Sequence, residues 1–188
     1  MARRPAAPPL PDWNLVVTTR PRRFAEACEV IGAFGPLRRT TFFNVLVGRI
    51  GETEPFLETM RARFAQEPEL ASIFGRIVPA ARCFDFASPE EFTTRAEVIA
   101  LGWLDRLAGS SFHIRLHRRG GKQLLAGHPV EKLLDDALID ALRERGATAT
   151  VSFDDPEHIL IIETVGTRAG LSLWSREERA RYPFLNLD

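Results

Sequence analysis

Basic side chains gather between Ser111 and His128, and this segment has the strongest potential chemistry in the chain. It holds four Arg or Lys residues, three His residues and neither Asp nor Glu, although the formal net charge of the whole chain is zero. A local excess of positive charge attracts polyanions. RNA is the polyanion that we expect it to bind.

The side chains of this segment alternate in the way that a two-faced β-strand requires. Apolar residues occupy every second position from Phe112 to Leu116, and His or Arg residues occupy the positions between them. Successive side chains of a strand point to opposite faces, so the pattern predicts one buried face and one basic face. The following residues, Arg118 to Lys122, are predicted to form a basic loop that contains two glycines.

This loop suits phosphate chemically. A guanidinium group can donate two parallel hydrogen bonds to phosphate oxygens, and the glycines at 120 and 121 let backbone N–H groups approach closely. Because RNA stems are recognised mainly by shape and backbone, contacts from Arg115, Arg118, Arg119 and Lys122 would suffice. The alternative is an ordinary solvated edge strand with a polar turn, since arginines on edge strands also prevent aggregation.

Other kinds of site find little support in the sequence. His113 and His117 share a face, but Arg115 lies between them, and no thiol or carboxylate follows closely enough to complete a zinc site. The Gly121-Lys122 pair lacks the earlier glycine of a phosphate-binding loop. The acidic residues at 154–157 are explained by a turn. We therefore expect no catalytic residue, no metal and no cofactor.

Composition limits the class of protein. With 188 residues, of which 45% are hydrophobic, the chain can form one ordinary domain or two small ones. Cys28 and Cys83 form no CxxC pair and lie among apolar residues, which predicts free thiols in a reducing cytoplasm. No apolar run reaches membrane-spanning length, so we expect a cytoplasmic protein with no membrane contact. The proline-rich residues 1–11 are predicted to be a disordered lead-in.

The first half of the chain, residues 12–87, predicts a small ferredoxin-like domain with the order β-α-β-α-β. The predicted strands are 13–18, 41–50 and a run over 73–86 that Pro79 interrupts, and the predicted helices begin near Pro21 and Glu54. Arg20, Arg22 and Arg23 precede the first helix. Because a helix N-terminus favours phosphate, we expect these arginines to contribute to RNA binding.

The second half, residues 88–188, begins with the sequence Ser88-Pro89-Glu90-Glu91, which is a capping box with proline at the first helical position. A helix to about Gly109, the basic strand and a long amphipathic helix over 130–145 follow. Strands are then predicted over 147–153, 159–165 and 171–174. This order predicts an α+β fold of two small α/β domains.

The order of helix, basic strand, amphipathic helix and the sequence V-S-F-D-D-P-E-H-I-L-I-I-E-T at 151–164 resembles the THUMP domain. The preceding half, with Trp13 to Val17 and Arg76 to Pro79, looks like the ferredoxin-like domain that precedes THUMP in tRNA-modifying proteins. The ending at 182–187 is similar to that of stand-alone THUMP proteins.

This resemblance implies binding of tRNA at the acceptor stem and the 3′ CCA end, with the two domains acting together. It also implies a non-catalytic adaptor that presents tRNA to a separate enzyme such as a cytidine acetyltransferase, because 188 residues leave no room for a fused catalytic domain. The family's basic strand and loop fall on Arg115, His117, Arg118, Arg119 and Lys122, and its Pro-Asp turn falls on Pro156-Glu157.

Two other functions stay open. A small-molecule-binding regulatory protein built from paired ferredoxin-like domains would have a ligand pocket between its domains and no salt-dependent affinity for RNA. An enzyme could instead assemble its site from residues that are distant in sequence, although the missing motifs count against it.

Overall fold

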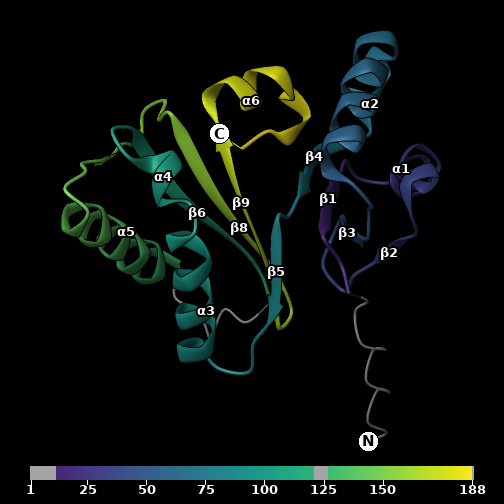
Figure 1. Ribbon diagram of the computed structural model, residues 1–188. Helices are drawn as coiled ribbons and strands as arrows, with labels where there is room; N and C mark the ends of the chain where they lie inside the picture. The colour runs from purple at the N-terminus through teal and green to yellow at the C-terminus, as the bar shows by residue number, and fades with distance from the viewer. Residues whose placement is uncertain (1–11, 121–126, 188) are drawn as a thin grey trace, which may run out of the picture.

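The computed structural model describes residues 12–120 and 127–187, and the expected lead-in at 1–11 lies outside this range. Two β-sheets lie at the centre, with helices α1 and α2 on one side and α3, α4 and α5 on the other (Figure 1). The four-stranded sheet has the order β2-β3-β1-β4, and the five-stranded sheet has the order β5-β9-β8-β6-β7. The fold is α+β with two small units, as the sequence predicted.

The first unit has the order β-α-β-β-α-β, and all its neighbouring strands are antiparallel, which is the ferredoxin-like arrangement. Its elements are β1 (Leu15–Thr19), α1 (Phe24–Ile31), β2 (Leu37–Arg39), β3 (Val45–Gly48), α2 (Thr53–Gln66) and β4 (Phe74–Pro79), with short 3-10 helices at Gly32–Phe34 and Pro68–Ser72. The strand predicted over 41–50 corresponds to β3, and no strand was predicted at the position of β2. A strand of three residues that contains two arginines shows no hydrophobic alternation, so β2 was missed.

The second unit contains the parallel pair β6 and β8, with β9 antiparallel to β8. Its elements are β5 (Arg82–Asp85), α3 (Pro89–Leu101), α4 (Leu104–Leu107), β6 (Ser111–Arg119), α5 (Gly127–Glu144), β7 (Thr150–Val151), β8 (His158–Val165) and β9 (Arg168–Ser175). Helix α6 (Arg176–Arg181) and the 3-10 helix η3 (Pro183–Leu185) follow. The predicted N-cap at Ser88 is present, since its side chain accepts a hydrogen bond from the backbone N–H of Glu91.

The two sheets divide earlier than the expected domain boundary at residue 87. Strand β5 precedes that boundary but pairs with β9 of the second sheet. The predicted run over 73–86 is therefore two strands in different sheets. The end of the chain follows the second unit in sequence but packs with the first. Tyr182, Phe184 and Leu187 are buried in the same core cluster as residues of α2 and β4.

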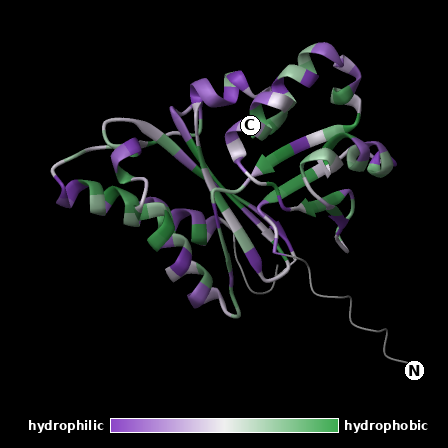
Figure 2. Cartoon of the chain, turned by 45° about the vertical axis from the view of Figure 1, so that its right-hand side comes forward, coloured by the Kyte–Doolittle hydropathy of each residue, from purple (hydrophilic) through white to green (hydrophobic). Residues whose placement is uncertain are grey.

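Each sheet packs one face against helices, and the faces turned away from the helices meet each other. Figure 2 shows hydrophobic residues running through the strands, while the helices carry both hydrophobic and hydrophilic residues. Between the sheets, Trp13 and Val47 share a cluster with Val165. A Cβ added at Gly170 would lie 2.8 Å from the Trp13 ring, so this close packing requires glycine. No helix within the described ranges is long and apolar enough to cross a bilayer.

A buried carboxylate forms the polar centre of this inter-sheet layer. Glu163 on β8 is 1% exposed and forms ion pairs with Arg119 on β6 and with Arg76 on β4, the latter at 3.5 Å between Nη1 and Oε1. Arg119 also donates a hydrogen bond of 3.2 Å to the hydroxyl of Thr18 on β1. Burial raises the pKa of the Glu163 carboxyl, and the two guanidinium groups act in the opposite direction. These contacts join strands of both sheets.

We predict that Glu163→Gln lowers the free energy of unfolding by about 3 to 5 kcal/mol, because it leaves two partly buried arginines without their carboxylate. Asp136→Asn is the control, since it removes one carboxylate from the exposed pair between Lys132 and Asp136. Denaturant titration followed by circular dichroism measures both variants. Equal midpoints for the two variants would show that the buried cluster does not hold the sheets together.

Candidate nucleic-acid interface

The basic residues of β6 lie on both faces of the strand. The sequence placed Arg118 and Arg119 in a loop, but both are paired strand residues opposite Thr164 and Val165 of β8. Alternation puts Arg118 on the helix side, where a Cβ added to Gly127 at the start of α5 would lie 3.3 Å from its guanidinium group. Arg119 points to the other side, toward the first sheet. The predicted set of contacts is therefore not one surface.

The residues on the inner face of β6 are engaged within the protein. The Arg119 side chain is 15% exposed and forms the ion pair with Glu163. Arg115 donates a hydrogen bond of 3.3 Å to the backbone carbonyl of Leu187. Burial, together with the charges of Arg76, Arg119 and Arg115, lowers the pKa of His117 to about 3. His117 is thus neutral at neutral pH and brings no positive charge to a phosphate. Lys122 lies outside the described residues.

The arginines near the start of α1 differ in how they are paired. Arg23 donates to the carboxylate of Glu26 at 2.8 Å. Arg20 and Arg22 are exposed, and within the described residues neither forms an ion pair with an acidic side chain. The structure therefore gives Arg20 and Arg22 a charge that remains available to a ligand.

The neighbouring strand β2 contributes two more exposed arginines. Arg38 and Arg39 are exposed, and neither has an acidic partner in the part of the chain that the structure describes. We call Arg20, Arg22, Arg38 and Arg39 the basic rim. Sequence reasoning missed the two residues of β2, although the adjacent pair Arg38-Arg39 was a visible signal. What it could not show is that most other arginines are neutralised by ion pairs.

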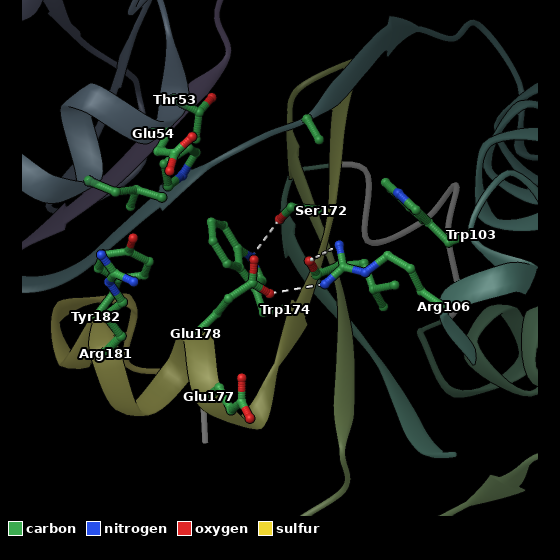
Figure 3. A pocket seen from close by; sticks show the side chains of 14 residues that line it. Thr53, Glu54, Trp103, Arg106, Ser172, Trp174, Glu177, Glu178, Arg181 and Tyr182 are labelled. Carbon is green, nitrogen blue, oxygen red and sulfur yellow. Dashed lines mark hydrogen bonds and ion pairs between the residues drawn. The ribbon is translucent and has the colours of Figure 1, made fainter. Parts of the chain in front are cut away.

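A second feature lies between the two units. A cavity of about 490 Å³ is lined by Trp103, Trp174 and Tyr182, among others. Figure 3 shows these side chains. Its polar groups are largely paired, because Arg106 contacts Glu178 at 3.0 Å and the Trp174 indole N–H donates to Ser172. Both signs of charge line this cavity, so it is not specific for an anion.

Nucleophilic or metal chemistry finds no constellation in residues 12–120 and 127–187. No group of three or more His, Cys, Asp or Glu side chains there could hold a metal ion. Both cysteines are free thiols. Burial raises the pKa of Cys83 to about 11 and also raises the pKa of Cys28, so neither forms a reactive thiolate near neutral pH.

No protein-family model matches the sequence, and no curated protein matches it either. Solved structures do share the fold. TrmN from Thermus thermophilus is 18% identical, with a TM-score of 0.56 over 85% of this chain and 44% of that one. PH1313 from Pyrococcus horikoshii is 11% identical, with a TM-score of 0.55 over 86% of this chain and 54% of that one.

A 4-thiouridine synthetase solved in complex with RNA and ATP is also similar. It is 11% identical, with a TM-score of 0.54 over 86% of this chain and 41% of that one. The chain thus spans about half the length of these structures or less. At such low identity the likeness concerns the fold, and it supports the THUMP-like fold that the sequence resemblance implied.

The lowered pKa of His117 predicts a pH dependence of stability. Its folded pKa of about 3 lies below its ordinary value of 6.5, so the folded state disfavours the protonated ring. The stability that the neutral ring contributes is complete above the ordinary value and is lost as the pH falls toward the folded pKa. The free energy of unfolding, measured by denaturant titration between pH 7 and pH 4, should therefore change with pH by different slopes in the parent and in His117→Asn. The parent should lose stability more steeply on acidification; parallel curves would contradict the burial of a neutral imidazole.

Proposed function

We propose that this protein is a non-catalytic tRNA-binding module that recognises the acceptor stem and the 3′ CCA end. The observation that carries the proposal is the basic rim. In a chain with equal numbers of basic and acidic residues, these exposed arginines lack acidic partners within the described residues, and two of them, Arg22 and Arg39, line one cavity of the first unit. Unneutralised guanidinium groups attract a phosphate backbone, so RNA binding requires no net positive charge on the whole chain.

The end of β6 is the part of the second unit that lies near the basic rim. Phe42, on the turn that follows β2, lies close to Gly120, where an added Cβ would be 2.8 Å from the phenylalanine ring. The basic rim and the end of the basic strand are therefore neighbours. We assign the phosphate contacts to the rim in place of Arg119 and Arg23, which have acidic partners.

The likeness to a synthetase solved with RNA supports this assignment at the level of the fold. The details of the RNA, namely the acceptor stem and the CCA end, come from the resemblance to THUMP proteins. The adaptor role, with a separate modifying enzyme such as a cytidine acetyltransferase as partner, has the same origin.

A second candidate function is small-molecule binding, and the cavity in Figure 3 is the observation that favours it. It lies between the two units, where a paired regulatory protein would bind its ligand. A protein of that kind would show thermal stabilisation by a metabolite and no salt-dependent affinity for RNA.

We predict that the chain binds total tRNA with an affinity that falls with salt. If the four rim arginines each contact one phosphate, the slope of log K against log salt concentration is roughly −3, from about 0.7 to 0.9 per contact. Arg20→Glu with Arg38→Glu should abolish the gel shift. Arg95→Glu with Arg143→Glu changes the net charge equally at exposed helix positions and should bind like the parent. Removal of the CCA end should weaken binding by the parent separately.

If the rim double variant binds like the parent at every salt concentration, the rim is only a solvated surface. If the two double variants lose affinity equally, the effect comes from net charge and not from a localised site.

We also predict that the purified chain modifies no nucleotide alone. It is to be incubated with tRNA and, in turn, acetyl-CoA with ATP, S-adenosylmethionine, or a sulfur donor, and the nucleosides are then analysed by mass spectrometry. Because the proposal assigns catalysis to a partner, the nucleoside profile should match that of untreated tRNA. A new modified nucleoside would overturn the adaptor role while leaving RNA binding intact.

A further inference from the structure

A second cavity, of about 330 Å³, opens beside the basic rim. The turn between β2 and β3 forms one wall, and residues at the start of α1 form the other. Arg22 and Arg39 of the rim line it together with Phe24, Phe43 and Asn44, and no acidic side chain is among its lining residues. This charge pattern distinguishes it from the cavity between the two units, whose lining includes three glutamates.

Phe43 is the most exposed large hydrophobic residue in the described part of the chain, at 83%. Its neighbour Phe42 serves the fold, because it packs with the inter-sheet cluster and against Gly120. Packing therefore explains one phenylalanine of this turn and leaves the other facing solvent. An aromatic ring held at the mouth of a cavity offers a flat apolar face to a ligand.

The turn that carries Phe43 is held in one conformation. The hydroxyl of Thr40 donates to the carbonyl of Val45 at 2.9 Å and accepts a hydrogen bond from the backbone N–H of Phe42 at 3.1 Å. These bonds fix the residues on both sides of Phe43. The ring is thus presented by an ordered turn, which reduces the conformational entropy that a ligand must remove on binding.

The arginines of the cavity keep their charge. The Arg39 guanidinium carbon lies 3.6 Å from the centre of the Phe24 ring, and this stacking orients the group without neutralising it. Arg22 is held at a positive φ of 66° at the opposite wall. Two fork-shaped donors therefore line the same cavity as an exposed aromatic ring. That combination matches a nucleotide, which has a flat base and an anionic phosphate.

We propose that this cavity binds one unpaired nucleotide of the RNA, with its base stacked on Phe43 and its phosphate held by Arg22 and Arg39. The inference rests on the proposed RNA-binding function and names the part of the RNA that this surface takes. Stacking is tolerant of sequence because every base has a π-face, so the site selects single strands over duplex more than one base over another. Duplex regions are left to the outer arginines of the rim, Arg20 and Arg38.

Two RNA probes test the proposal with the full chain: a blunt hairpin, and the same hairpin with a short single-stranded 3′ extension. Fluorescence anisotropy measures both affinities at one salt concentration. The parent should bind the extended hairpin about tenfold more tightly, which is within the range of stacking one base on an aromatic side chain. Phe43→Ala should lose this preference and keep the affinity for the blunt hairpin.

Conservative variants separate stacking from simple apolar contact. Phe43→Trp should keep or increase the preference for the extension, whereas Phe43→Leu should lose it. Phe153→Ala is the matched control, because Phe153 is also an exposed phenylalanine, at 73%, but lies in the second unit. Arg39→Gln should lower the salt slope for the extended hairpin by about 0.7 and leave the slope for the blunt hairpin unchanged.

The outcomes distinguish this inference from the function on which it rests. If neither hairpin binds the parent, RNA binding itself fails. If both bind the parent equally and Phe43→Ala changes neither affinity, RNA binding stands and the nucleotide site is overturned. If Phe43→Ala instead abolishes self-association in sedimentation and leaves both RNA affinities unchanged, the ring is a protein contact and the nucleotide site is overturned as well.

Discussion

The buried carboxylate of Glu163 is the constraint on which the rest of the structure depends. It lies in the layer where the two sheets meet, and its partners Arg119 and Arg76 come from strands of different sheets. Transferring charged groups from water into the protein interior has a large free-energy cost, which offsets the attraction between them. We therefore infer that the cluster specifies the relative position of the sheets more than it adds stability. It also commits the inner face of β6 to packing. Strand β6 has a sequence typical of RNA binding, but part of its basic face is therefore buried inside the protein.

Because the inner face of β6 is committed to packing, the positive charge that is available to a ligand lies on other parts of the protein. In a chain without net charge, the potential outside the protein depends on which charges are left unpaired. Ion pairs engage Arg119 and Arg23, and burial keeps His117 neutral. Arg20, Arg22 and the two arginines of β2 are exposed and keep a charge that no ion pair within the described residues neutralises. A phosphate backbone would thus be attracted to a position that composition alone does not reveal.

The sequence predicted those elements whose patterns are local. Helix α5 has a continuous apolar stripe and β6 alternates, so each was found within a few residues of its observed bounds. Helix α3 begins at the predicted side-chain cap but ends at Leu101, and the separate short helix α4 occupies part of the stretch that was predicted as one helix to about Gly109. Strand β2 is too short for a pattern, and β5 was assigned to the wrong sheet because its partner β9 follows it by more than eighty residues. For the same reason the sequence did not show that Arg119 forms an ion pair, since its carboxylate partner is 44 positions away. Charge pairing over such separations follows from the fold and leaves no local signal, so the sequence located the basic residues and could not tell which remain free.

The end of the chain makes the two units dependent on each other. Tyr182 donates a hydrogen bond of 2.6 Å to Glu58 of α2, and the Asn186 side chain donates to the carbonyl of Gly75 in β4 at 2.8 Å. Phe184 and Leu187 are buried in a core cluster that includes residues of α2 and β4. A fragment that begins at residue 88 would expose these apolar side chains and would leave Glu163 without Arg76. Loss of RNA binding by such a fragment would therefore report a damaged fold as readily as a missing contact. Point substitutions on the exposed arginines change the surface without removing a buried partner. For this reason they determine more clearly than a fragment does how much each unit contributes to the affinity for RNA.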